Sequence, residues 1–391
     1  MPRFFRAQQR FDWGKWLMLA LLFALSYALF YQMTLRPSSD IAIHATWAAE
    51  GDFRDPTSFV HHGAHPMWHV LVSVLLHLGL PLPAASALIT ALSKVFIAYA
   101  THRMLTSALR DRLSETAITL FTGILMLVSC LCVPSLNPTV YAGIGTPNTW
   151  HSCTQLMAMA FMLVCVPRTA RCYELFSPSA PLAWRQPVML GVLLFLSLLA
   201  KPTFMQAFLP AASLFFLYHW IRRPQCSRCF VQVLVCVLPA VALMIFQYLY
   251  YFGIIVPWQS SVVLEYDWGK ALHVLLRVVL ILAFPLYTLV LCRAQKADTT
   301  FVLTLLLNLT AIVEMLLLGE DGRRASDGNF GWGMMGASLM LWVVCLIRFL
   351  RQQDVWNWRR PRNLVGWLLL AWHLASGVYY IGYLFVSGAS L

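Results

Sequence analysis

The chain has 391 residues, of which 60% are hydrophobic and only 11% are charged. Soluble domains are about 45–50% apolar, so this composition excludes a globular cytosolic enzyme and also a disordered chain. The net charge of +12 would suit nucleic-acid binding, but the basic residues lie in short loops between apolar runs. Such loops set the orientation of a membrane protein. No nucleic-acid partner is therefore expected, and the sequence predicts a chain embedded in the lipid bilayer.

Apolar runs of about 20 residues, the length that crosses a bilayer as a helix, recur along the chain. Two of them contain a basic residue, Lys94 in 83–104 and Arg277 in 272–292. The run 188–220 is too long for one span, and basic residues flank both of its ends. We therefore interpret it as a hairpin with Lys201 at its outer tip. The other predicted spans are 16–35, 117–133, 149–166, 230–256, 299–318, 330–347 and 364–386.

The apolar segment 67–80 is too short to span, so we interpret it as a helix at the membrane surface. Eleven spans then result, within a range of ten to twelve, and the N-terminus faces the cytoplasm. Twenty of the 28 basic residues fall on the cytoplasmic side, in agreement with the positive-inside rule. The predicted fold is all-α, a single polytopic membrane domain over residues 1–391 with peripheral helices on its outer face.

Two peripheral helices are predicted in the outer loop 36–82. Ser39 or Asp40 can cap the first helix and Gly51 can end it. Its apolar residues at 41, 45 and 48 form one stripe, as in a helix that lies on a membrane surface. Asp40 would then lie beside the outer end of the first span, either as a helix cap or as a chemically active carboxylate.

Four histidines follow within nine residues: His61, His62, His65 and His69. Histidines at such spacing can bind zinc. However, Pro66 places the start of the next helix after His65, which separates His65 from His69. Histidine and tryptophan are also common at the headgroup interface. We prefer the interfacial interpretation, predict no metal site, and leave a divalent cation open as a cofactor.

The densest polar stretch on the predicted outer side is the loop 319–331, which alternates acidic, basic and glycine residues before an aromatic-flanked span. Planar polar side chains bind sugar hydroxyls, and aromatic faces pack on the C–H surfaces of sugars. The stretch is therefore either a sugar-binding loop or a loop whose charges neutralise one another. Its candidate ligands are Glu320, Arg323, Arg324, Asp327 and Asn329.

Lys201, Lys270, Arg323 and Arg324 are the candidate cations for a phosphate group. Lys201 lies between two apolar runs at the predicted outer surface, where the alternative role is a lysine that extends to the interface. Deeper in the spans, Glu314 is an intramembrane acid, for which Lys94 and Arg277 are the candidate partners.

The order of these features resembles the GT-C superfamily of polyprenyl-phosphate-sugar-dependent membrane glycosyltransferases. An aspartate follows the first span, a surface helix ends in glycine, and a His-Pro step opens a second peripheral helix. The similarity covers the layout of roughly the first 220 residues, although many members have Pro-Pro or Lys-Pro where this chain has His65-Pro66. The residues that carry it are Asp40, Gly51, His65-Pro66, Arg110-Asp111-Arg112, Pro147-Asn148 and Lys201-Pro202.

The resemblance implies that Asp40 is the general base that deprotonates the acceptor hydroxyl. A polyprenyl phosphate leaves already ionised, so cations that hold the phosphate would suffice without a general acid. Direct displacement would invert the anomeric centre. The substrate- and phosphate-binding residues implied are His44, His65, Lys201, Lys270, Glu320, Arg323, Arg324, Asp327 and Asn329.

The predicted function is therefore transfer of a sugar from a polyprenyl-phosphate carrier to a glycan or lipid acceptor, as in lipopolysaccharide, O-antigen or capsule modification. A polymerase of oligosaccharide repeat units needs the same parts. A transporter or flippase would concentrate polar residues near the midplane, whereas here they gather at the outer edge. A non-catalytic assembly subunit would tolerate loss of Asp40 and Lys201. No glycosylation sequon lies on the outer side, which favours a bacterial inner membrane with a periplasmic active site.

Overall fold

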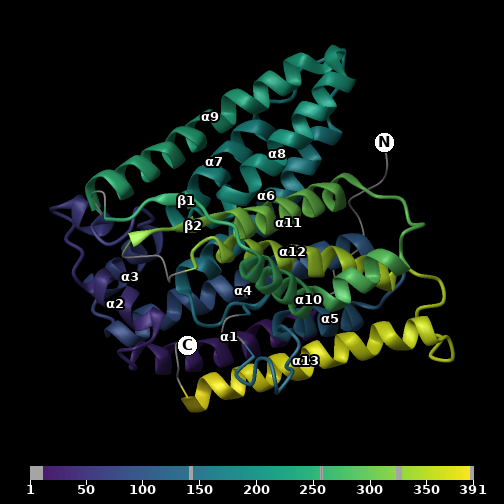
Figure 1. Ribbon diagram of the computed structural model, residues 1–391, viewed down its shortest axis with the longest axis horizontal. Coiled ribbons are helices and arrows are strands. Elements are labelled where there is room, and N and C mark those ends of the chain that lie inside the picture. The colour runs from purple at the N-terminus through teal and green to yellow at the C-terminus, as the bar shows by residue number, and fades with distance from the viewer. Residues whose placement is uncertain (1–11, 141–143, 256, 258, 323–327, 388–391) are drawn as a thin grey trace.

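The computed structural model describes residues 12–140, 144–255, 257, 259–322 and 328–387. These residues form a bundle of long helices that run in the same direction or its reverse (Figure 1). Nine described helical segments are long and apolar enough to cross a membrane. They are α1 (Trp13–Thr34), α4 (Leu82–Leu109), α6 (Cys153–Glu174), α8 (Thr203–Arg222), the run Pro224–Ile255 that contains α9 (Ser227–Tyr250), α10 (Trp268–Leu291), α11 (Thr299–Leu317), α12 (Gly331–Leu350) and α13 (Pro361–Ser387).

Two shorter apolar helices complete the bundle, α5 (Glu115–Leu127) and α7 (Arg185–Ala200). With them, each of the eleven predicted spans has a helix in the structure. The predicted hairpin is confirmed as α7 and α8, which meet at Lys201 and Pro202. The all-α polytopic fold predicted from the sequence is thus confirmed.

Two helices lie at the end of the bundle where α1 ends: α2 (Asp40–Ala49) and α3 (Met67–His77). A 3₁₀ turn, η1 (Pro56–Val60), lies between them. The Ser39 hydroxyl accepts the backbone N–H of Ala42 at 3.0 Å and donates to the carbonyl of Met33. Ser39 is therefore the cap, and Asp40 is the first helical residue. At 11 residues, α3 is too short to span a bilayer.

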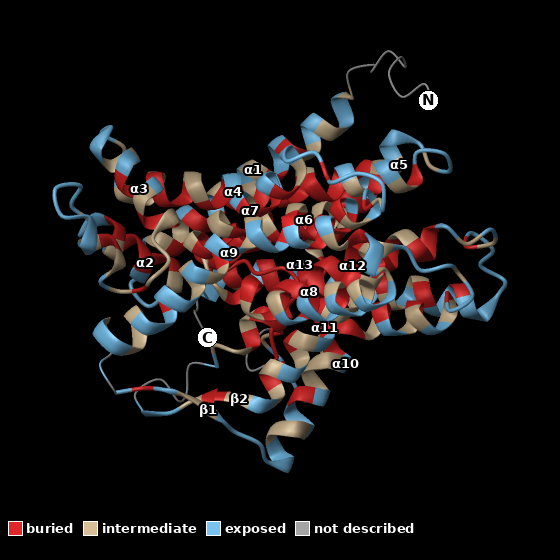
Figure 2. Ribbon diagram, turned by 90° about the horizontal axis from the view of Figure 1, so that it is seen from above, coloured by how far each residue is buried: buried red, intermediate tan, exposed pale blue. Residues whose placement is uncertain are grey.

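The helix α12 lies at the centre of the bundle and is buried over almost its whole length (Figure 2). Small residues on its first turns, among them Gly333 and Gly336, allow neighbouring helices to approach closely. Further along, the indole N–H of Trp342 donates to the carbonyl of Ile281 at 3.0 Å, and the Asn308 amide donates to the carbonyl of Ala337 at 3.0 Å. These contacts connect α12 to α10 and α11.

The predicted span 117–133 is wrong in its second half, because α5 ends at Leu127 and the chain continues as extended backbone inside the protein. Pro134 disfavours helical geometry at the residue before it. Extended backbone in a membrane must find hydrogen-bond partners within the protein. Accordingly, the N–H of Ser129 donates to the carbonyl of His373 on α13, and that of Leu131 to the carbonyl of Leu280 on α10. Likewise, α6 begins at Cys153, later than predicted, and continues past Pro167.

A short two-stranded antiparallel sheet lies at the same end as α2 and α3 (Figure 1). Its strands are β1 (Val262–Leu264) and β2 (Leu318–Glu320). They join the chain before α10 to the chain after α11. A π-helical turn, η3 (Tyr251–Ile255), precedes β1, and a 3₁₀ turn, η2 (Pro224–Cys226), precedes α9.

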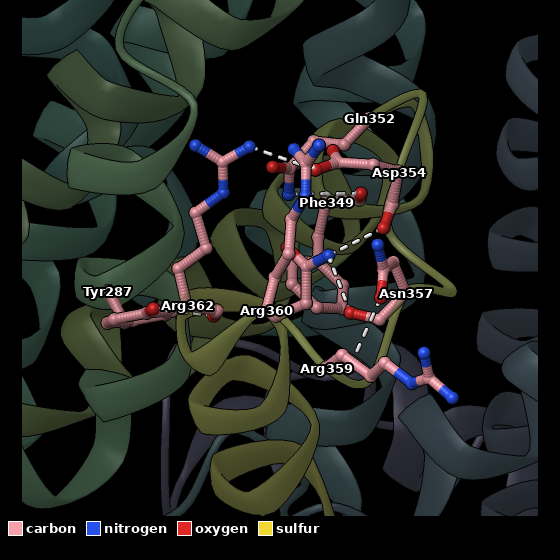
Figure 3. A network of polar contacts seen from close by, with 9 residues as sticks. Tyr287, Phe349, Gln352, Asp354, Asn357, Arg359, Arg360 and Arg362 are labelled. Atoms are coloured by element: carbon pink, nitrogen blue, oxygen red, sulfur yellow. Dashed lines mark hydrogen bonds and ion pairs between the residues drawn. The ribbon is translucent and has the colours of Figure 1, made fainter.

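At the opposite end, the turn between α12 and α13 is closed by polar contacts around Asp354 (Figure 3). The Asp354 carboxylate forms ion pairs with Arg360 and with Arg362, the latter at 2.9 Å. The hydrogen bond from Arg362 holds the pKa of Asp354 below its ordinary value. The hydroxyl of Tyr287 donates to the carbonyl of Arg362 at 2.6 Å, which ties α10 to the same turn.

Gly377 is the point where α13 packs directly on the backbone of the α5 end. A Cβ atom at Gly377 would collide with the carbonyl of Leu127, whereas a Cβ at Gly382 on the same helix would meet nothing within 4 Å. We therefore expect Gly377→Ala to lower the free energy of unfolding by about 1–3 kcal/mol through overpacking. Gly382→Ala, the matched control, should be neutral or slightly stabilising. Thermal unfolding of the two detergent-solubilised variants checks this, and equal melting temperatures would contradict it.

Candidate active site

The carboxylate of Asp40 lies at the start of α2, beside the outer end of α1. Its Oδ1 atom lies 3.7 Å from Nε2 of His44, one helical turn further on. Its Oδ2 atom is buried and accepts no hydrogen bond from any residue that the structure describes. A buried carboxylate oxygen without a donor is energetically unfavourable. Among the described residues, this oxygen therefore keeps an unused hydrogen-bond acceptor position.

His44 and His69 connect the two peripheral helices through their rings. Nδ1 of His44 lies 2.9 Å from Nε2 of His69. The pKa of each histidine is lowered from 6.5 to about 3, mainly by burial, and at His44 the positive charge of Lys201 contributes to this lowering. Both rings are therefore neutral at physiological pH, and one N–H lies between them. If His69 donates that N–H, the proton of His44 is on Nε2 and faces Asp40.

Aromatic rings enclose this histidine pair. Trp47 packs edge-on against His44 with ring centroids 4.7 Å apart, and it stacks on His62 at 4.9 Å. The ring of His62 is in turn 2.9 Å from a carboxylate oxygen of Glu50. Trp68 is fully buried behind His44 and donates its indole N–H to Thr90 on α4 at 3.1 Å. The surface helix α2 is thereby fixed both to α3 and to the transmembrane bundle.

His65 lies at the edge of the same cluster. Its ring centroid is 6.3 Å from that of His44 and 6.3 Å from that of His69. Within the described part of the chain, the four histidines between 61 and 69 do not gather three ligand atoms within metal-binding reach of one another. One of these histidines, His69, is instead hydrogen-bonded to His44.

Lys201 approaches from the turn between α7 and α8. Its ammonium lies over the indole ring of Trp332, 4.2 Å from the ring centroid, a cation–π geometry. The charge of this ammonium lowers the pKa values of both His44 and His151, so Lys201 lies within electrostatic range of both rings. The sequence predicted Lys201 at an outer hairpin tip, and the structure adds that this tip lies near His44, His151 and Trp332.

His151 lies on the loop before α6 and completes the cluster. Its Nδ1 atom is 2.9 Å from the hydroxyl of Tyr380 on α13, and its ring packs 5.6 Å from that of Trp332. The pKa of His151 is lowered to about 4, mainly by burial. Of the nearby charges, that of Asp40 acts to raise the pKa and that of Lys201 to lower it. Asp40, His44, Lys201, His151 and Trp332 therefore form one polar cluster, contributed by four separate parts of the chain.

A chain of amide and hydroxyl contacts fixes the helices that carry this cluster. Gln155 on α6 donates to the carbonyl of Trp332 at 3.0 Å and accepts from the hydroxyl of Thr203 at 2.9 Å. Gln247 on α9 donates both to the carbonyl of Ala64, at 2.6 Å, and to the carbonyl of Leu198, at 3.0 Å. These contacts fix three segments relative to one another: the histidine-rich loop, the α7–α8 turn and the start of α12.

Arg277 is a cation near the site that the sequence placed within a span. Its Nε atom donates to the carbonyl of Ile144 at 2.7 Å. Its guanidinium also lies against Gly145 and against Gly331, the first residue of α12, where an added Cβ would come within 3.4 and 3.0 Å. Trp332 follows directly. The glycines at 145 and 331 were the available sequence signal, since they allow a guanidinium to approach the backbone.

The predicted ligands of the outer loop lie apart from this cluster in the β1–β2 region. The Lys270 ammonium is hydrogen-bonded to the Glu265 carboxylate at 3.0 Å and to the carbonyl of Leu318 at 2.9 Å. The Glu320 carboxylate accepts from the amide of Asn329 at 2.6 Å. Arg323, Arg324 and Asp327 lie outside the described residues.

Lys94, a candidate partner of Glu314, instead supports the loop of His151. Its Nζ atom donates to Oδ1 of Asn148 at 2.8 Å and lies over the Trp150 ring, 4.1 Å from the centroid. Asn148 donates to the carbonyls of Leu125 and Val128. Asn148 and Trp150 are therefore buried and held by contacts within the protein.

Among solved structures, the chain resembles that of ArnT from Cupriavidus metallidurans bound to undecaprenyl phosphate. The TM-score is 0.52 and the sequence identity 14%, over 91% of this chain and 63% of the ArnT chain. This chain has an ArnT-like fold. The GT-C resemblance predicted from the layout is thus confirmed for the fold. The present chain spans less than two thirds of the length of the ArnT chain. No family model and no curated protein matches the sequence.

The lowered histidine pKa values predict a pH-dependent stability. In the unfolded chain His44, His69 and His151 regain pKa values near 6.5, so below that pH the unfolded state binds more protons than the folded state. The free energy of unfolding should be at its full value above pH 6.5. Below pH 6.5 the free energy of unfolding should decrease, by up to about 1.4 kcal/mol per pH unit for each histidine.

Thermal unfolding of the detergent-solubilised protein at pH 8, 6.5 and 5 measures this. The double variant His44→Gln/His69→Gln should lose less melting temperature between pH 6.5 and 5 than the native chain. His77→Gln, which changes an exposed histidine at the end of α3, is the matched control. A double variant with the full native pH dependence would refute the assignment of neutral rings.

Proposed function

We propose that the protein is a membrane glycosyltransferase that transfers a sugar from a polyprenyl-phosphate carrier to a hydroxyl of a glycan or lipid acceptor. The observation that carries the proposal is the buried Oδ2 atom of Asp40, which has no described hydrogen-bond donor and lies in a cluster with Lys201. The ArnT-like fold supports it, because the similar ArnT structure holds undecaprenyl phosphate.

In the proposed reaction Asp40 acts as the general base. The acceptor oxygen attacks the anomeric carbon, the bond from that carbon to the phosphate oxygen breaks, and the hydroxyl proton passes to Asp40. The polyprenyl phosphate leaves with the electron pair of the broken bond and needs no proton. One base and fixed positive charge therefore suffice, and the anomeric centre is inverted.

Lys201 is the proposed counter-charge for the phosphate. Its ammonium is presented at the surface end of α7 and is oriented by the Trp332 ring. Arg277, against the first residue of α12, is the second cation available on this side. A helix N-terminus next to a guanidinium favours anions. Residues Arg323 and Arg324 remain further candidates.

The isoprenoid chain of the carrier has a suitable place below Lys201. An apolar groove of about 250 Å³ lies between α7, α8 and α9. It begins near Met205, shortly after Lys201 on α8, and continues to Trp220 at the other end of that helix. Its walls include Leu190 and Leu194 on α7 and Val233 on α9. We propose that a polyprenyl chain lies in this groove while its phosphate contacts Lys201.

We further propose that the reaction takes place on the periplasmic face of a bacterial inner membrane. The basic loops lie at the other end of the bundle and support this orientation. The product would be a modified surface glycan such as lipopolysaccharide or O-antigen.

Asp40→Asn tests the proposed base. The exchange keeps the size of the side chain but removes the proton acceptor, so glycan modification should fall by about 10²–10⁴-fold. The measurement is mass spectrometry of surface glycans from cells that carry the native chain, the variant or a deletion. Protein levels in the membrane must be matched.

Asp52→Asn is the matched control, because Asp52 is an exposed acid in the same outer loop. It should leave the glycans unchanged. A native glycan profile from Asp40→Asn would contradict the general-base role. A deletion strain with unaltered glycans would instead favour a transporter.

Lys201→Gln tests the phosphate contact. Loss of a fixed cation at the leaving group should reduce transfer by about 10²–10³-fold, and Lys201→Arg should restore part of it. Lys296→Gln changes an exposed lysine at the far end of the bundle and should be silent. Full transfer by Lys201→Gln in isolated membranes would show that other cations hold the phosphate.

A further inference from the structure

Three potential metal ligands meet where α1 begins. Asp12 is the cap residue before α1, His102 lies near the end of α4, and Glu115 is the first residue of α5. One ligand atom from each lies within 4.8 Å of those from the other two. Within the described part of the chain, no other group of three or more histidine, cysteine, aspartate or glutamate residues has this spacing.

This cluster is separate from the candidate active site. Asp12 precedes the 22 residues of α1 and Asp40 follows them. A helix of that length spans about 33 Å. The cluster therefore lies at the opposite end of the bundle, and nothing in the proposed glycosyl transfer uses it.

Asp12 has an oxygen available for a ligand. Its Oδ1 atom accepts the backbone N–H of Lys15 at 3.2 Å, which caps α1. Its Oδ2 atom is buried and receives no hydrogen bond from any described residue. Burying such an atom costs free energy unless it is paired with a donor or a cation.

His102 is buried, with 4% of its surface exposed, and a threonine hydroxyl lies next to each ring nitrogen. Nε2 is 3.3 Å from Oγ1 of Thr119, and Nδ1 is 3.4 Å from Oγ1 of Thr106. Metal-binding histidines normally hydrogen-bond through their second nitrogen, which fixes the ring and the tautomer. If one ring nitrogen of His102 binds the ion together with the carboxylates, the second ring nitrogen still has a threonine hydroxyl as its hydrogen-bond partner.

We propose that Asp12, His102 and Glu115 bind a divalent first-row transition ion, either Zn²⁺ or Mn²⁺. One imidazole nitrogen and two carboxylates suit such ions, whereas Ca²⁺ takes six to eight oxygen ligands. Two carboxylates also neutralise the charge of the ion. Three protein ligands leave a coordination position for water, which can enter because Glu115 is exposed.

The ion would join three helices at one point, the start of α1, the end of α4 and the start of α5. The competing cations are the side chains of Lys15 and Arg103, which act electrostatically on His102. If they alone balance the two carboxylates, no metal is needed. The experiment must therefore measure bound metal directly.

The full-length protein, purified in detergent and stripped with a chelator, is titrated separately with Zn²⁺ and with Mn²⁺. Metal per protein is measured by elemental mass spectrometry after desalting, and thermal unfolding is followed in parallel. The variants are Asp12→Asn, which keeps a good helix cap, His102→Gln and Glu115→Gln. Asp111→Asn is the matched control, an exposed acid in the same α4–α5 turn.

We expect about one ion per chain, with a raised melting temperature, in the native protein and in Asp111→Asn. Each of the three ligand variants should weaken binding by about tenfold or more and lose the shift in melting temperature. Glu115 is exposed, so Glu115→Gln tests the proposal even if a buried variant fails to fold. Absence of binding by the native protein, or unchanged binding by Glu115→Gln, would overturn it.

Discussion

The side-chain nitrogen of Lys94 and the amide of Asn148 form the contact on which the outer end of the molecule depends. A bilayer offers no water to extended backbone, so the non-helical chain after α5 is possible only if its polar groups are paired inside the protein. Asn148 satisfies the carbonyls of Leu125 and Val128, and Lys94 satisfies Asn148. The loop that carries His151 is thereby fixed.

The same scarcity of water determines the chemistry of the cluster around Asp40. His44, His69 and His151 are buried, and a protonated ring there would lack solvation, so the rings remain neutral. Neutral rings orient a carboxylate without compensating its charge. Asp40 and Lys201 are the acidic and basic side chains among these neutral rings, with the Arg277 guanidinium nearby. Electrostatic interactions in such surroundings are stronger than in water.

Hydropathy and basic flanks were enough to predict the helical bundle, the hairpin at Lys201 and the surface position of α2. These features depend on local composition, which a single sequence contains. The end of α5 at Leu127 was not predicted. The apolar residues after Leu127 have the hydropathy of a span, but their backbone pairs with α10 and α13. Only the tertiary structure supplies those partners.

Some residues of the candidate site could likewise be predicted from the sequence and others could not. Asp40 and Lys201 could be selected from the sequence, because each is a charge at a predicted membrane boundary. Trp332, Tyr380 and Arg277 were not selected, since the first two look like ordinary interfacial aromatics and Arg277, whose signal was the pair of glycines at 145 and 331, lies within an apolar run. Lys270 and Glu320 were selected for charge, and the structure pairs them with neighbours in the β1–β2 region.

The groove between α7, α8 and α9 bears on the donor specificity of the proposed glycosyl transfer. A polyprenyl chain held along α8, as proposed, would fix the height of its headgroup in the bilayer, because the groove begins close to the turn that carries Lys201. Water-soluble sugar nucleotides contain comparable phosphates but no such chain, and nothing would hold them at that depth. Selectivity for lipid-linked sugars would then come from apolar burial rather than from recognition of the phosphate.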